Sequence, residues 1–154
     1  NPSLGGVYKL AAIKEGDEWI PKLKISDTEE KITNPALKTT YRIYDEEGLA
    51  AADLICLKDE TFDTDKPLTI FHPIETWKKT TFHKHSMRDL MTDIIRNGEL
   101  VYDFPKLEEV KAYTKKSLSE FSEEHKRLIN PHIYKVDLSD KLYALKHKLI
   151  HSEH

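Results

Sequence analysis

TTYRIYDEEGLAAADLICL, residues 39–57, is the stretch that decides how this chain folds. Two apolar-rich segments, Thr39–Tyr44 and Leu49–Leu57, flank the polar turn Asp45–Gly48. Gly48 has no Cβ and is therefore free to take the positive φ that tight turns between strands use. The stretch predicts an antiparallel β-hairpin.

Shorter strand patterns lie on both sides of this hairpin. They cover residues 7–10, 19–25, 67–71, 94–96 and 99–102. Pro21 places the second of them at a sheet edge or at a strand start, because proline lacks an amide hydrogen. Asn97-Gly98, between the last two, is the strongest hairpin signal in the chain. So many short strands favour an antiparallel or mixed sheet over a parallel α/β core.

The apolar spacing becomes helical after Pro105. One helix, ended by Asn130-Pro131, is predicted from Leu107, Val110, Tyr113, Leu118, Phe121 and Leu128. A second helix is expected to begin at Asp137 or Ser139, either of which can act as N-cap. Its apolar stripe is Leu138, Leu142, Leu145 and Leu149. The predicted fold class is α+β, with a strand-rich region over residues 1–104 and a helical C-terminal tail over residues 105–154.

The composition limits the function classes to which this chain can belong. Its 154 residues suffice for one domain with a core of its own. The net charge of −3 argues against a general nucleic-acid binder, which normally carries a basic excess. A single cysteine, Cys56, excludes an internal disulfide and a cysteine-rich zinc site within one chain. No apolar run approaches the ~18 residues of a membrane helix and no signal-peptide pattern opens the chain, so we expect a soluble, cytoplasmic protein.

Cations and hydroxyls gather around the segment that connects the strands expected at residues 19–25 and 39–44. They are Lys22, Lys24, Ser26, Lys31, Thr33, Lys38 and Arg42. Lysine is a mobile cation suited to phosphate oxygens, and hydroxyls and loop amides can complete a phosphate cradle. Alternatively, the lysines form an exposed strand face and a solvated loop in which Asp27, Glu29 and Glu30 neutralise part of the charge. The residues by themselves leave both interpretations open.

A second basic cluster is interleaved with two aromatic residues, Trp77 and Phe82. Its members are Lys78, Lys79, His83, Lys84, His85 and Arg88. Such a patch can bind nucleic acid through phosphate contacts and base stacking. The negative overall charge and the absence of a recognition motif favour instead a basic loop whose aromatic residues pack inward.

The remaining chemistry-bearing residues form weak patterns. Two histidine groups have metal-ligand spacing, namely His83 with His85, and His147 with His151 and His154. Neither has a supporting carboxylate arrangement, so no metal site is expected. Gly5-Gly6 permits a close backbone approach but is weak evidence alone, and Cys56 is expected to be a small core residue. No nucleophile–histidine–acid set and no phosphate-binding glycine motif is present, so no catalytic residue is assigned.

Seven segments, taken together and in order, resemble one enzyme family. They are PSLGGVYKL (2–10), PKLKIS (21–26), EKITNP (30–35), YRIYD (41–45), ADLI (52–55), FHPIETWK (71–78) and KRLINP (126–131). The chain is similar, over nearly its whole length, to the C-terminal region of a bacterial nicotinate phosphoribosyltransferase. The combination is specific, although each segment alone is not.

The resemblance implies a role in NAD biosynthesis. Enzymes of this family are transferases that join nicotinate to phosphoribosyl pyrophosphate, giving nicotinate mononucleotide and pyrophosphate, with a ligase-type coupling to ATP hydrolysis. The implied cofactors of the whole enzyme are ATP and Mg²⁺, and none is expected for this region alone. The barrel domain, which holds the nicotinate pocket and a phosphorylated histidine, lies upstream in the family. None of the eight histidines of this chain is therefore assigned that role.

The resemblance also implies where this region meets phosphate. In enzymes with this barrel the active site lies at a dimer interface, and cations of the neighbouring subunit reach the phosphates. A homodimer is therefore expected. The phosphate- or pyrophosphate-binding candidates are Ser3, Lys22, Lys24, Ser26, Lys31 and Lys38. The alternative is a free-standing module that binds phosphorylated ligands or serves as a scaffold.

The start of the chain suggests a fragment. Asn1 stands where a methionine would begin a gene product, and a strand pattern follows almost at once. We expect the 154-residue chain to be inactive by itself and to expose an apolar surface that the barrel normally covers. The chain departs from the family in two places. Ala36-Leu37-Lys38 follows Asn34-Pro35, where the family commonly has a small residue or glycine and a second nearby cation. Lys106 stands where a serine often caps the long helix, which weakens the cap by about 1 kcal/mol. The first departure leaves the loop conformation after Pro35 open.

Overall fold

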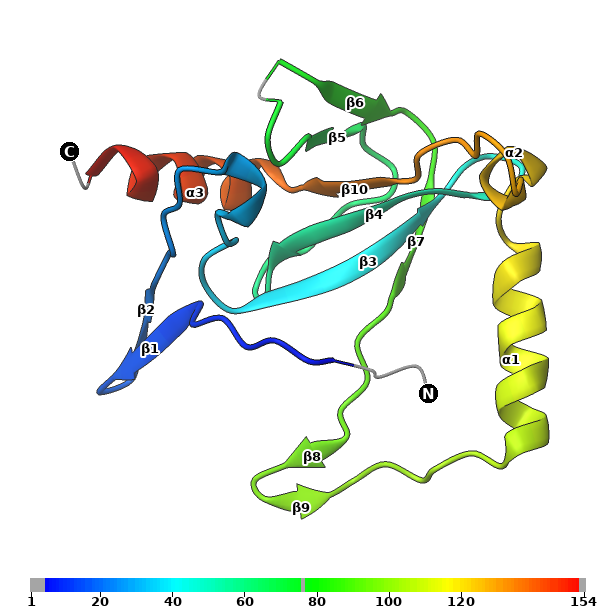
Figure 1. Cartoon of the computed structure of the whole chain (residues 1–154), viewed down its shortest axis with the longest axis horizontal. Helices are drawn as coiled ribbons and strands as arrows, with labels where there is room; N and C mark the ends of the chain where they lie inside the picture. The colour runs from blue at the N-terminus through cyan, green and yellow to red at the C-terminus, as the bar shows by residue number, and fades with distance from the viewer. Residues whose placement is uncertain (1–4, 76, 153–154) are drawn as a thin grey trace.

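A six-stranded sheet forms the body of the computed structural model, which describes residues 5–75 and 77–152 (Figure 1). Its strands are β3 (Lys38–Tyr44), β4 (Ala50–Leu57), β5 (Leu68–Phe71), β6 (Lys79–Phe82), β7 (Ser86–Asp89) and β10 (Lys135–Leu138), in the spatial order β6-β5-β10-β4-β3-β7. Only β10 and β4 run parallel, and the other neighbours are antiparallel. The mixed, strand-rich fold class predicted from the sequence is confirmed.

The hairpin of β3 and β4 forms as predicted. The Asp45 carboxylate holds the turn by accepting hydrogen bonds from the backbone amides of Glu47 and Leu49 at 3.0 and 2.9 Å. Gly48 takes a φ of 79°, which suits a residue without a Cβ. The pairing register shifts after Ile43. β4 begins at Ala50, one residue later than predicted.

The sheet is curled, because its two edge strands follow one another in the sequence. Residues 83–85 connect β6 to β7, and a connection of this length spans about 14 Å at most. A flat sheet of six strands would hold its edges about 24 Å apart. The side chains inside the curl form the apolar core, which consists of Ile43, Ala52, Leu54, Cys56 and Ile70, with Phe82 and Met87 from the two edges packed against it.

Three strands of the sheet were missed or misplaced by the sequence analysis. β10 lies in the middle of the sheet, although residues 105–154 were expected to be helical only. β6 and β7 occupy the stretch that was interpreted as a basic loop. Each has only four residues, which is too few for a clear alternation of apolar and polar positions.

Two small hairpins lie outside the main sheet. The first pairs β1 (Ala12–Glu15) with β2 (Glu18–Pro21), whereas residues 7–10 form no strand and are exposed. The predicted strand over 19–25 is therefore wrong in its second half, since β2 ends at Pro21. The second pairs β8 (Ile95–Arg96) with β9 (Glu99–Leu100), as Asn97-Gly98 predicted, and both turn residues take positive φ.

The predicted long helix is two helices, α1 (Leu107–Ser119) and α2 (Glu123–Lys126). The break follows Glu120, whose backbone carbonyl accepts a hydrogen bond from the Ala50 amide at 2.8 Å instead of continuing the helix. The Glu120 carboxylate is held by Arg88 at 2.7 Å and by the Tyr44 hydroxyl at 2.8 Å. These contacts tie the end of α1 to the sheet, and the apolar spacing alone could not reveal them.

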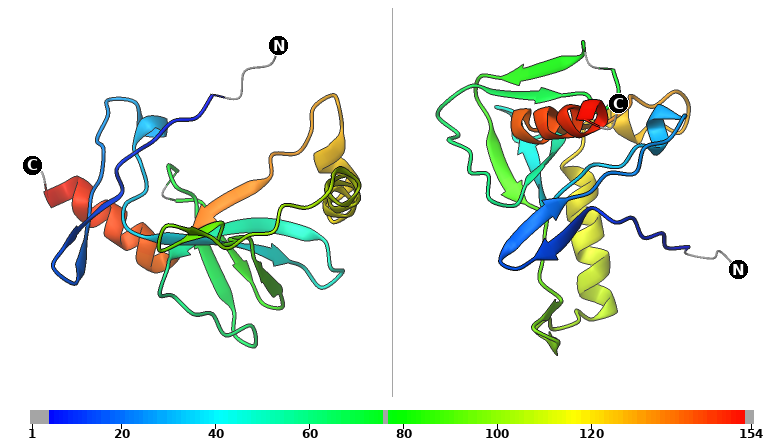
Figure 2. Two further views of the ribbon diagram at one scale, coloured as in Figure 1. Left: turned by 90° about the horizontal axis from the view of Figure 1, so that it is seen from below. Right: turned by 90° about the vertical axis from the view of Figure 1, so that its left-hand side faces the viewer.

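The last helix, α3 (Asp140–Ser152), forms as predicted and contacts β4 and β5 at one end of the sheet (Figure 1). Ser139 is its N-cap, because its hydroxyl oxygen accepts a hydrogen bond from the Leu142 amide at 3.2 Å. Leu142 is fully buried, and the Tyr143 ring stacks on Phe71 of β5 at 4.9 Å. In contrast, α1 buries no residue and stands apart from the sheet, as Figure 1 and the left view of Figure 2 show. No helix in the described part of the chain has the length and apolar character needed to span a membrane.

Candidate functional site

The basic segment between β2 and β3 folds into a closed loop over residues 22–36. The backbone amides of Lys22 and Ala36 both donate to one acceptor, the Ala11 carbonyl, at 2.8 and 2.7 Å. This shared acceptor brings the two ends of the loop together. The loop therefore has the form of a compact surface loop with close ends, a type that is frequently functional.

Two predicted hydroxyl groups hold the shape of this loop. The Thr33 hydroxyl oxygen accepts from the Lys24 amide at 3.0 Å, and the Ser26 hydroxyl oxygen accepts from the Thr28 amide at 3.3 Å. A 3-10 turn, η1 (Glu29–Lys31), lies between them. Both hydroxyls act only as acceptors in these bonds, so each keeps its own O–H for another partner.

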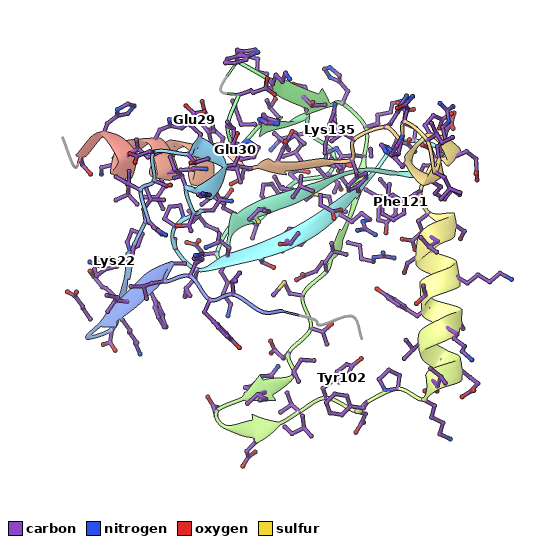
Figure 3. The ribbon with its side chains drawn as sticks, in the orientation of Figure 1. Lys22, Glu29, Glu30, Tyr102, Phe121 and Lys135 are labelled. Atoms are coloured by element: carbon purple, nitrogen blue, oxygen red, sulfur yellow. The ribbon has the colours of Figure 1, made fainter. Side chains whose placement is uncertain are left out.

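Three lysines of the loop have no ion-pair partner among residues 5–75 and 77–152. Lys24 and Lys31 are exposed, and Lys22 is half-buried. No carboxylate of the described residues, including those of Glu29 and Glu30, lies within 4.0 Å of their ammonium groups. Figure 3 shows Lys22 near the β1–β2 hairpin and well away from Glu29 and Glu30 beside α3. Lys22 and the acidic residues of η1 therefore lie at different places along the loop.

Lys38 and Arg42, the last two cations of the stretch, have other partners. The Lys38 ammonium donates to the carbonyls of Pro35 and Ala36 at 3.1 and 2.6 Å, and burial lowers its pKa. Arg42 forms a fork with the Asp53 carboxylate at 2.8 and 3.0 Å, which raises the pKa of its guanidinium group. Lys38 retains one N–H beyond these two bonds, because an ammonium group has three donors.

A cavity of about 630 Å³ opens beside Lys38, between the start of β3 and residues 89–101. Lys58 and Arg96 add positive charge to its lining, whereas Asp89 and Asp93 add negative charge. Arg96 is already paired with Asp93, and Asp89 accepts from the Thr39 hydroxyl at 3.4 Å. The cavity is polar and nearly balanced in charge.

Ser3, the first of the phosphate-binding candidates, lies outside the described residues.

The structure gives the backbone conformation after Pro35, which the sequence left open. Ala36 takes a φ of 69°, in the left-handed region that favours glycine. Glycine takes this conformation without a steric cost, whereas the Cβ of Ala36 makes it less favourable. It also turns the Ala36 carbonyl toward the Lys38 ammonium.

The second basic cluster does not form one patch. Arg88 pairs with Glu120, Lys78 with Glu75, and Lys84 with Glu46 at 3.4 Å. Both ring nitrogens of His85 are buried and have no hydrogen-bond partner among the described residues, and burial lowers the pKa of this histidine. Phe82 packs inward, as predicted, whereas Trp77 is exposed, against prediction.

Cys56 and the histidines, the other residues singled out in the sequence, are placed as follows. Cys56 is a fully buried core residue, as predicted, and burial raises the pKa of its thiol to about 12. His147 and His151 lie on α3 with their rings 6.3 Å apart, and His154 is outside the described residues. Across residues 5–75 and 77–152, no group of three or more His, Cys, Asp or Glu side chains is placed to hold a metal ion.

A polar network on the face of the sheet opposite the core was not predicted from the sequence. The Tyr134 hydroxyl donates to Asp53 at 3.0 Å, and the Phe121 ring lies under the Arg42 guanidinium, 4.7 Å from its centroid. Burial and the negative charge of Asp53 raise the pKa of Tyr134. One feature of the sequence could have predicted this network. Arg42 and Asp53 have opposite charges and face each other across the hairpin.

The family model described as "Nicotinate phosphoribosyltransferase C-terminal domain" matches residues 37–146. The chain belongs to this family. The matched residues contain the whole six-stranded sheet of this nicotinate phosphoribosyltransferase domain, from β3 to β10. They begin after the basic loop, so Lys38 is the only one of the phosphate-binding candidates inside the matched region.

Relatives and a solved structure agree with this family. The nicotinate phosphoribosyltransferase of Bacillus subtilis is 36% identical over 151 residues, which are 97% of this chain and 31% of that protein. The enzyme of the same name from Caenorhabditis elegans is 35% identical over 96% of this chain and 26% of its own length. The crystal structure of human nicotinic acid phosphoribosyltransferase superposes with a TM-score of 0.70 and 29% identity, covering 77% of this chain and 24% of that chain. The chain thus spans less than a third of the length of these relatives.

Proposed function

We propose that this chain is the C-terminal part of an enzyme that makes nicotinate mononucleotide in the cytoplasm. In the proposed reaction the pyridine nitrogen of nicotinate bonds to the ribose carbon of phosphoribosyl pyrophosphate, and the bond from that carbon to pyrophosphate breaks. ATP hydrolysis drives the reaction, and Mg²⁺ accompanies the phosphates. The observation that carries this proposal is the family match over residues 37–146, together with similarity to named enzymes over 97% of the chain.

The proposed contribution of this chain is support and positive charge rather than the reacting groups. The reaction develops negative charge on the departing pyrophosphate, and cations held near it lower the barrier. Lys22, Lys24 and Lys31 suit this role, because they extend from a loop of fixed backbone and have no carboxylate partner in the described part of the chain. Two further candidates can donate a hydrogen bond to phosphate: Ser26 through its O–H and Lys38 through its third N–H.

The test uses the longer enzyme that contains this chain. Lys22→Ala, Lys24→Ala and Lys31→Ala variants are each measured for the affinity of ATP and of pyrophosphate. We expect one or more of them to weaken binding at least about tenfold, which is the scale of one charge-assisted hydrogen bond. Lys111→Ala, on the exposed side of α1, is the matched control and should leave both affinities unchanged. Unchanged affinities in all three loop variants would remove the proposed role of the loop.

A separate measurement tests the enzyme assignment itself. The longer enzyme should convert nicotinate and phosphoribosyl pyrophosphate to nicotinate mononucleotide, and the 154-residue chain alone should not. Turnover by the 154-residue chain alone would contradict the proposal. Failure of the longer protein to turn over nicotinate, with retained binding of phosphorylated ligands, would favour the free-standing binding module instead.

A further inference from the structure

A second cavity, of about 300 Å³, lies where β6, β10 and the β5–β6 connection meet. Its lining includes Trp77, Lys78, Lys79, Thr80, Lys135 and Asp137. The cavity is far from the basic loop in the sequence, and neither the family match nor the names of the relatives assign it a role. It combines a buried acid, several cations and an exposed aromatic ring.

Asp137 is the buried acid of this cavity. It is 4% exposed and lies on β10, opposite Leu54 of β4. Its carboxylate accepts no hydrogen bond from any side chain or loop amide of residues 5–75 and 77–152, and burial raises its pKa. Asp137 lines the cavity and its oxygens are not among the fully enclosed polar atoms without a partner, so the carboxylate is accessible to a ligand that brings O–H or N–H donors.

His72 does not satisfy this carboxylate. Its Nδ1 atom accepts from the backbone amides of Ile74 and Glu75 at 3.3 and 2.9 Å. An acceptor nitrogen carries no proton, so the ring proton is on Nε2, which lies 3.7 Å from the Glu75 carboxylate. Both ring nitrogens of His72 therefore face groups of residues 74–75 in its own loop.

Cations surround the acid without neutralising it through direct contact. The Lys135 ammonium donates to the Thr80 hydroxyl at 2.9 Å, and Figure 3 shows Lys135 between β10 and β6. Lys79 has no carboxylate partner within the described ranges, whereas Lys78 is paired with Glu75. Lys79 and Lys135 thus leave positive charge available at the rim of the cavity.

Trp77 supplies a flat apolar surface at the same rim. Its side chain is 74% exposed, which is uncommon for a residue whose burial contributes so much to folding. An exposed indole beside lysines is a surface on which a planar heterocycle can stack.

We propose that this cavity binds a nucleoside 5′-phosphate. The ribose hydroxyls donate to Asp137, the base stacks on Trp77, and the phosphate contacts Lys79 and Lys135. The volume is at the lower end of the range for ligand pockets, so the ribose occupies the cavity while the base and the phosphate lie at its rim. A bare phosphate fits poorly, because the Asp137 carboxylate would repel it. The proposal does not depend on the enzyme assignment.

The first test compares three probes with the 154-residue chain. AMP, ribose 5-phosphate and inorganic phosphate are titrated by calorimetry, and in a Trp19→Phe background, where Trp77 is the one remaining tryptophan, by fluorescence. We expect AMP to bind and to quench the Trp77 emission, ribose 5-phosphate to bind about tenfold more weakly without quenching, and phosphate to show no saturable binding. Equal affinity for AMP and phosphate, or no AMP binding, would overturn the proposal.

The second test assigns the binding to this cavity. Asp137→Asn, which is nearly isosteric, and Lys79→Ala, which changes only a surface side chain, should each weaken AMP about tenfold or more. Asp140→Asn and Lys141→Ala are the matched controls, because both residues are exposed and lie just beyond the cavity on α3. AMP binding that is unchanged in both cavity variants would place the site elsewhere and refute the inference.

Discussion

The curled sheet and the arm formed by the β8–β9 hairpin and α1 differ in how they are stabilised. Every second residue of β4 is buried, and α3 adds the fully buried Leu142. In the arm, neither β8, β9 nor α1 has a buried residue. The comparison indicates that burial in the sheet and α3 stabilises the chain. The side chains of the arm are exposed and therefore available for contacts beyond the sheet and α3.

The arm should make the isolated chain associate. Its apolar side chains, and those of the segment after α2, are largely exposed: Phe104, Val110, Tyr113, Leu128 and Ile133. Exposed apolar side chains in this number favour association in water. We expect sedimentation velocity of the 154-residue chain to show oligomers at micromolar concentration. A Val110→Glu/Tyr113→Glu double variant should shift the distribution toward monomer, and a monodisperse wild-type monomer would contradict this prediction.

Truncating one leucine in each region should separate their contributions to folding. Leu54→Ala, at a fully buried core position, should lower the free energy of unfolding by about 3–4 kcal/mol, because it removes buried methyl groups and leaves a cavity. Leu107→Ala, in the exposed first turn of α1, should change it by less than about 0.5 kcal/mol. Urea unfolding followed by circular dichroism measures both. Equal losses in the two variants would mean that the arm is part of the cooperative core.

The opposite face of the sheet should be sensitive to the loss of Asp53. This carboxylate accepts from Arg42 and Tyr134, and the Arg42–Asp53 pair is mostly buried. Asp53→Ala leaves the Arg42 guanidinium without its partner and should cost about 2–3 kcal/mol in urea unfolding. The exposed Lys66–Asp63 pair is the control, and Asp63→Ala should cost less than about 0.5 kcal/mol. A small effect at Asp53 would show that water replaces the lost partner.

The cap of α3 should have an intermediate effect. The Ser139 hydroxyl accepts from the Leu142 amide and donates to the buried Glu60 carboxylate at 2.7 Å. Ser139→Ala removes both bonds and should lower stability by about 1–2 kcal/mol, measured in the same way. Ser119→Ala, in the last turn of α1, has no such partners in the sheet and should be nearly neutral. Equal effects would argue that the cap does not couple α3 to the sheet.

The sequence predicted those elements whose signals are local. The Asp45–Gly48 and Asn97-Gly98 turns specify their hairpins through backbone conformation, and Ser139 marks the start of α3 through its hydroxyl. These features need no knowledge of distant residues, so the β3–β4 hairpin, the β8–β9 hairpin and α3 were all predicted.

Elements fixed by distant contacts were not predicted. β10 is a strand because four residues pair with β4 across about 80 positions of sequence, and α1 ends where Glu120 meets Arg88, Tyr44 and Ala50. The same limit applies to the candidate site: the lysines could be named from the sequence, but the commitment of Lys38 and Arg42 to other partners depends on the folded arrangement.

The smallest expected effect concerns the junction between the basic loop and the sheet. Ala36 pays a conformational cost at a φ of 69°, where its Cβ crowds the backbone, and glycine would not. Ala36→Gly should therefore raise the free energy of unfolding by about 0.5–1 kcal/mol, part of the gain being offset by the greater freedom of glycine in the unfolded chain. Ala51→Gly in β4, where the backbone is extended, is the matched control and should destabilise by a similar amount. A destabilising effect at Ala36 would mean that its methyl group contributes more by packing beside Trp19 and Leu145 than the left-handed conformation costs.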